Sequence, residues 1–166
     1  MEDWRRIDID AYDPEGGRLT AEDLVPPYTS QVTLQTLQPK ISQLRSAATS
    51  GDFATALQNA TTDPPYSADE PTKMQYFQTV LEVLTQVRQA EIANIVKQLS
   101  SEQQYVLVKY LYKGMSLPEG QKQGGILLSW FEKISQISGV NPIVRYLSDR
   151  RTVWKFSLGK EQKRYK

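Results

Sequence analysis

Residues 105–153 read YVLVKYLYKGMSLPEGQKQGGILLSWFEKISQISGVNPIVRYLSDRRTV and carry the strongest fold signal in the chain. The run 105–112 is apolar almost all round and leaves only Lys109 for solvent, a pattern typical of a buried helix. Gly114 suits the left-handed residue that ends such a helix. After a loop rich in Pro and Gly, apolar residues at spacings near 3.6 over 126–137 predict a second helix.

A third helix is expected after Gly139, which ends the second one. Asn141 is its predicted N-cap, and Pro142 fits the first helical position because that position needs no backbone N–H donor. Ile143, Val144 and Leu147 form its apolar face. Trp130 and Phe131 are adjacent and point about 100° apart on their helix, so one of them is expected in the core and the other at an interface, or both in the core.

Upstream residues also follow helical spacing. We expect helices that begin at Pro39, after the N-cap Asp52 and near Pro71, and a break near Gln89. Residues 101–104, SEQQ, read as a capping box for the buried helix. The chain therefore predicts an all-α fold of about seven helices with no convincing strand. Because no 34-residue repeat is present, we expect an irregular helical bundle with α-solenoid-like character.

Composition excludes several classes of function. The 166 residues include no cysteine and no histidine, which removes disulfides, Ser-His-Asp and Cys-His catalysis and the usual zinc sites. No phosphate-binding loop is present, and the carboxylates are densest in a Pro- and Gly-rich segment that does not suit acid-base catalysis. We predict no enzyme activity, no catalytic residue, no cofactor and no metal. No apolar run reaches the ~20 residues of a membrane helix.

Acidic and basic side chains are unevenly distributed along the chain. Residues 1–30 hold eight acidic and three basic side chains, whereas residues 151–166 hold six basic and one acidic. We predict three regions: an extended or partly disordered acidic arm at 1–37, an all-α domain at 38–153, and a flexible basic extension at 154–166. Solvated termini remain the alternative interpretation of both charge runs.

Five segments resemble one known family in the correct order: WRRIDIDAYD (4–13), GDFATAL (51–57), YLYKG (110–114), LLSWFEK (127–133) and IVRYLSDRRTV (143–153). They are similar to subunit 5 of the actin-related protein 2/3 complex, which nucleates branched actin filaments. The resemblance implies a compact all-α body with an extended arm, in a non-catalytic scaffold subunit of a seven-subunit hetero-oligomer. It also implies a place in the cytoplasm and actin cytoskeleton. Residues 154–166 extend past the family pattern.

The candidate site is an interface with other proteins. By resemblance, the arm tethers an actin-related subunit, and the last helix docks on neighbouring subunits, so that contact with the actin filament is indirect. Apolar anchors beside arginines are typical of interface centres. The candidates are Trp4, Ile7, Ile9 and Tyr12 in the arm, and Ile143, Val144, Arg145, Tyr146, Arg150 and Arg151 in the body.

Two other interpretations remain open. GDFATAL is also typical of the connection within a tetratricopeptide-like helix pair, so a free helical-repeat adaptor that binds peptides is the main alternative. The basic C-terminal residues could form a phosphate-binding patch, but they carry no nucleic-acid motif. We expect partners that are proteins, and neither nucleic acid nor a membrane.

Overall fold

The computed structural model describes residues 32–149 and Val153, and within this part of the chain it is all-α with no strand. The all-α prediction is confirmed. The described residues form eight helices where about seven were expected, because a short helix lies within the loop predicted after Gly114. The helices are α1 (Leu34–Thr49), α2 (Phe53–Thr61), α3 (Glu70–Gln86), α4 (Gln89–Gln98), α5 (Ser101–Ser116), α6 (Pro118–Gln121), α7 (Gly124–Ser138) and α8 (Asn141–Ser148).

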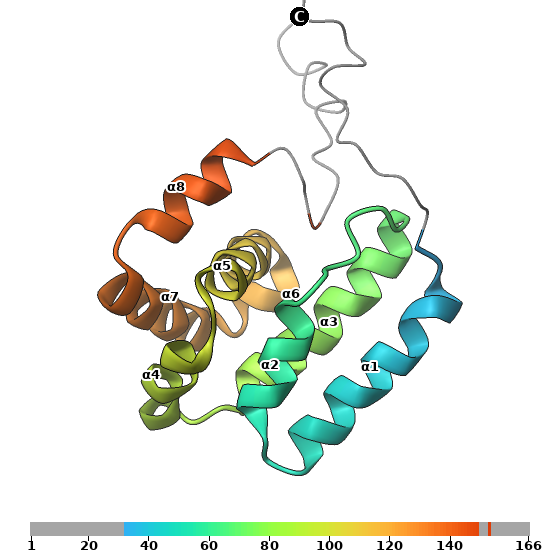
Figure 1. Ribbon diagram of the computed structural model, residues 1–166, viewed down its shortest axis with the longest axis horizontal. Helices are drawn as coiled ribbons and strands as arrows, with labels where there is room; N and C mark the ends of the chain where they lie inside the picture. The colour runs from blue at the N-terminus through green and yellow to red at the C-terminus, as the bar shows by residue number, and fades with distance from the viewer. Residues whose placement is uncertain (1–31, 150–152, 154–166) are drawn as a thin grey trace, which may run out of the picture.

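Helix α5 lies at the centre of the body (Figure 1). Helices α1, α2 and α3 pack together on one side of it, α4 and α7 pack together on the other, and α6 and α8 pack on α5 itself. Its apolar run is buried from Tyr105 to Leu111, as the sequence predicted. An irregular bundle around one central helix therefore fits this packing better than a row of repeated helix pairs.

The end of α5 differs from the sequence prediction. The helix continues past Gly114 to Ser116, and among the described residues only Gly51, Gly139 and Asp63 have a positive φ. Gly120 of α6 makes a close backbone contact with Gly114 of α5. A Cβ atom on Gly120 would lie 2.1 Å from the Gly114 carbonyl oxygen, so only glycine fits there.

The helix boundaries confirm some of the predicted caps and correct others. Asp52 accepts a hydrogen bond from the Thr55 backbone N–H at 3.1 Å and caps α2 as predicted. The capping box of α5 joins Ser100 and Gln103, one residue before the predicted box. Helix α1 begins at Leu34 and contains Pro39, because its first turns bury Leu37 against the core.

The start of α8 also departs from the prediction. Val140 is the N-cap, whereas Asn141 lies inside the helix and makes no side-chain cap. Pro142 falls in the first turn, where it removes no helical hydrogen bond. Gly139 ends α7 with φ 65°, as expected of a glycine at this position.

Candidate interaction surface

Helix α8 leaves a row of apolar side chains in solvent. Val140, Val144 and Leu147 are 70%, 56% and 75% exposed. Their spacing of four and three residues places them on one side of the helix. Only Pro142 of this helix is fully buried. We name these three residues the α8 stripe. An apolar row of this kind is a candidate for burial against another protein.

The opposite side of α8 is held by an aromatic cluster. Tyr146 stacks on Tyr112 of α5 with ring centroids 4.5 Å apart and planes inclined by 12°. Tyr112 in turn meets Phe131 of α7 edge to face at 5.6 Å. Partial burial raises the pKa of the Tyr146 hydroxyl. The cluster joins three helices and fixes which side of α8 faces outward.

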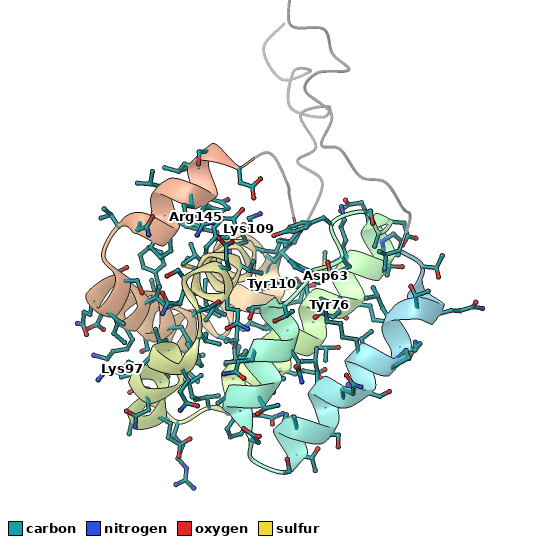
Figure 2. All side chains as sticks on the ribbon, viewed as in Figure 1. Asp63, Tyr76, Lys97, Lys109, Tyr110 and Arg145 are labelled. Atoms are coloured by element: carbon teal, nitrogen blue, oxygen red, sulfur yellow. The ribbon has the colours of Figure 1, made fainter. Side chains whose placement is uncertain are left out.

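An ion pair reinforces this arrangement near the start of α5. The Arg145 guanidinium contacts the Glu102 carboxylate and lies over the Tyr105 ring, 4.8 Å from its centroid. Because both charged side chains are partly exposed, the pair adds little to the free energy of unfolding. It helps to set the orientation of α8 relative to α5. Figure 2 shows Arg145 and Lys109 in the region between α5 and α8.

Lys109 is the main correction to the sequence prediction, which left it for solvent. Its side chain is 1% exposed. The ammonium group donates to Asp149 at 2.8 Å and to the Tyr66 hydroxyl at 3.1 Å. It also lies 4.4 Å from the Tyr66 ring centroid and 4.6 Å from that of Tyr105. A buried charge needs such partners, and here they hold the end of α8 on the body.

Helix α7 adds to the exposed apolar surface. Leu128 is 58% exposed and Ile137 is 37% exposed. Leu128 and the half-buried Phe131 border a shallow hollow on α7. Trp130, in contrast, is fully buried, and its ring N–H donates to the Leu84 carbonyl at 3.1 Å. Of the two adjacent aromatic residues, Trp130 therefore belongs to the core.

The predicted interface residues fall into three groups. Trp4, Ile7, Ile9, Tyr12, Arg150 and Arg151 lie outside the described residues. Val144 faces solvent, and Ile143 is half-buried. Arg145 and Tyr146 pack against α5. A partner contact by any of them stays a prediction. Sequence reasoning passed over Val140 and Leu128, although the amphipathic pattern of the C-terminal helices was the signal that could have found them.

Within the described part of the chain, no group of three His, Cys, Asp or Glu residues could hold a metal ion. The search for helices long and apolar enough to cross a membrane found none among the same residues.

Comparisons with known proteins agree on one family. The family described as ARP2/3 complex 16 kDa subunit (p16-Arc) matches residues 3–153. The chain is 72% identical to Actin-related protein 2/3 complex subunit 5 of Saccharomyces cerevisiae over 151 residues, which cover 91% of this chain and 98% of the relative. It is 33% identical to subunit 5-B of Xenopus laevis over 90% of this chain and 94% of that protein. The human subunit 5-like protein is 28% identical over the same shares of the two chains.

Proposed function

The chain belongs to the ARP2/3 complex 16 kDa subunit (p16-Arc) family, and we propose that it is a non-catalytic structural subunit of that complex. Its helical body docks on neighbouring subunits and supports the nucleation of branched actin filaments. Its partners are the other subunits, including an actin-related protein, and it works in the cytoplasm at the actin cytoskeleton.

The α8 stripe is the observation that supports this proposal. Val144 and Leu147 are large apolar side chains that the fold of the chain itself leaves more than half exposed. Burying an apolar side chain of this size gains about 1.5–3 kcal/mol. The aromatic cluster and the Lys109–Asp149 pair hold α8 on the body before any partner binds. Docking through this helix therefore loses little further conformational entropy.

A second part of the proposal concerns residues 1–31, which lie outside the described residues. Trp4, Ile7, Ile9 and Tyr12 give this segment four apolar or aromatic anchors among many acidic side chains. A segment of this length can extend on the order of 100 Å. If the segment binds the actin-related subunit, it raises the local concentration of that subunit, to about the mM range for a short linker. We propose that the segment holds this subunit near its active position.

Replacing both Val144 and Leu147 with Asp tests the docking surface. Because both side chains are exposed, the double variant should unfold at the wild-type temperature yet fail to copurify with the other subunits. Gln43→Asp on α1 is the matched control, since Gln43 is exposed and α1 lies at the opposite edge of the body from α8 (Figure 1). Normal incorporation of the double variant would rule out the α8 stripe as a docking surface.

Deleting residues 1–20 tests the tether separately. This deletion removes all four anchors but leaves the residues that precede α1 intact. The shortened subunit should assemble normally, and the assembled complex should nucleate fewer filaments in a pyrene-actin assay. Failure of assembly would instead make the arm an assembly element, and unchanged nucleation would remove the tether from the proposal.

A further inference from the structure

Helix α8, which carries the α8 stripe, is too short to be stable without contacts to the body. It has eight residues, and isolated helices shorter than about 12–15 residues are marginal in water. Only Pro142 of the helix is fully buried, and α5 is the helix on which it mainly packs (Figure 1). The position of α8 therefore depends on contacts along its inner side and at its ends.

The C-terminal end of α8 is placed by the buried Lys109. The Asp149 carboxylate, at the C-cap of the helix, accepts a hydrogen bond from the Lys109 ammonium group at 2.8 Å. The Lys109 side chain is 1% exposed and that of Asp149 is 15% exposed. Because the cost of burying two charges largely offsets their attraction, such a pair specifies a position but adds little net stability. The free energy that keeps this end of α8 in place is expected from an apolar contact.

Val153 supplies an apolar contact close to this end in the sequence. It is 5% exposed and belongs to the hydrophobic core that α1, α2, α3, α4, α5 and α7 also form. Val153 follows Asp149 by four residues, and an extended chain of that length reaches about 13 Å. The five residues between Leu147 and Val153, SDRRT, are polar or charged, so none of them could replace Val153 in an apolar core.

We propose that Val153 is a positioning residue, which anchors the end of α8 and thereby sets the direction in which the α8 stripe faces. Two contacts then restrain this end of the helix. The Lys109–Asp149 pair specifies where the helix ends, and the burial of Val153 supplies the hydrophobic free energy that keeps it there. The anchor is a contact within one chain, whereas its consequence for assembly rests on the proposed function of the α8 stripe.

The burial of one valine side chain sets the size of the expected effect. Exposing such a side chain changes an equilibrium constant by about tenfold or more. Without the anchor, the fluctuations that detach α8 from the body should become more frequent by about the same factor. Helices α1 and α2 keep their own buried side chains, so they should not open more often.

Hydrogen exchange of the full chain, followed by mass spectrometry, measures this opening. Val153→Asp places a charge where an apolar side chain is buried, so peptides covering residues 140–149 should exchange at least about tenfold faster. Peptides from α1 and α2 should exchange at the wild-type rate. Val153→Thr keeps the shape of valine but adds a hydroxyl group, and it should show a smaller increase even if the Asp variant fails to fold. Val153→Ile keeps an apolar side chain and should retain the protection of α8.

Val87→Ala is the matched control, because Val87 is also a core valine just outside a helix and is 2% exposed. This variant should lower the unfolding temperature without selective opening of α8. The proposal is overturned if the Val153→Asp and Val153→Thr variants leave α8 as protected as in the wild type. It is equally overturned if they raise exchange by the same factor in every helix.

Copurification with the other subunits separates the anchor from the proposed docking. The double variant with Asp at Val144 and Leu147 keeps the anchor, so its α8 should stay protected while assembly is lost. Val153→Asp should lose both the protection of α8 and most of the assembly, and Val153→Ile should retain both. If Val153→Asp frees α8 but assembles like the wild type, the anchor is supported and docking through the α8 stripe is refuted.

Discussion

Replacing Gly120 with alanine should unfold this protein at a much lower temperature. The added Cβ would lie 2.1 Å from the Gly114 oxygen, 2.6 Å from its carbonyl carbon and 2.8 Å from its Cα. Real Cβ atoms are essentially never closer than 3.0 Å to such neighbours. All three contacts are backbone atoms of α5, so no side-chain rotation relieves them, and α6 and α5 must separate.

The size of the effect follows from this geometry. Overpacking a core by one methyl group costs about 1–3 kcal/mol, and a clash between two backbones belongs at the upper end, about 3 kcal/mol. For a helical body of this size, each kcal/mol lowers the unfolding midpoint by roughly 4 °C. We therefore expect Gly120→Ala to lower the midpoint by roughly 12 °C.

Thermal unfolding followed by far-ultraviolet circular dichroism measures the effect. Gly124→Ala is the matched control, because a Cβ on Gly124 meets nothing within 4 Å and its φ is not positive. Alanine at this start of α7 should leave the midpoint unchanged or raise it slightly, since it reduces the freedom of the unfolded chain. Equal midpoints for the two variants would refute the close-contact reasoning.

The remaining predictions concern buried aromatic side chains. Tyr76→Phe should lower the free energy of unfolding in urea by about 1 kcal/mol, because the Ala60 carbonyl loses a donor at 3.0 Å. Tyr110→Phe should not lower it, since that buried hydroxyl has no partner among the described residues. Burial raises the pKa of both tyrosines, so the unfolded state loses protons first and stability should fall as pH rises above about 10, less steeply in the double Phe variant. Trp130→Ala should cost about 3–5 kcal/mol in the same urea titration, and unchanged stability would contradict its burial.

Periodicity was sufficient to predict most helices, but not their ends. The spacing of apolar residues reports which side of a segment is buried, and this signal extends over several turns in α3, α5 and α7. A boundary depends on a single cap or on the tertiary contact of one turn. Helix α1 therefore begins upstream of Pro39, in a turn that buries Leu37. The N-cap of α5 is Ser100, one residue before the predicted serine.

Helix α6 was missed because four residues are too few to show a helical period. Its position depends on the contact between Gly120 and Gly114, and the sequence contains nine glycines with nothing to mark these two as neighbours. Lys109 was misplaced for a similar reason. Its partners Tyr66 and Asp149 are 43 and 40 residues away in the chain, and no local pattern reports such a pairing.

The last helix shows why an apolar pattern alone does not identify an interface. Amphipathicity predicted that one side of α8 is apolar, but it did not say whether the chain itself or another protein covers that side. The structure separates these possibilities. Tyr146 and Arg145 attach the helix to α5, and these contacts leave Val144 and Leu147 outward. Packing among the described residues accounts for the inner side only, and the outward side is the part of the pattern that the proposed docking on a neighbouring subunit would explain.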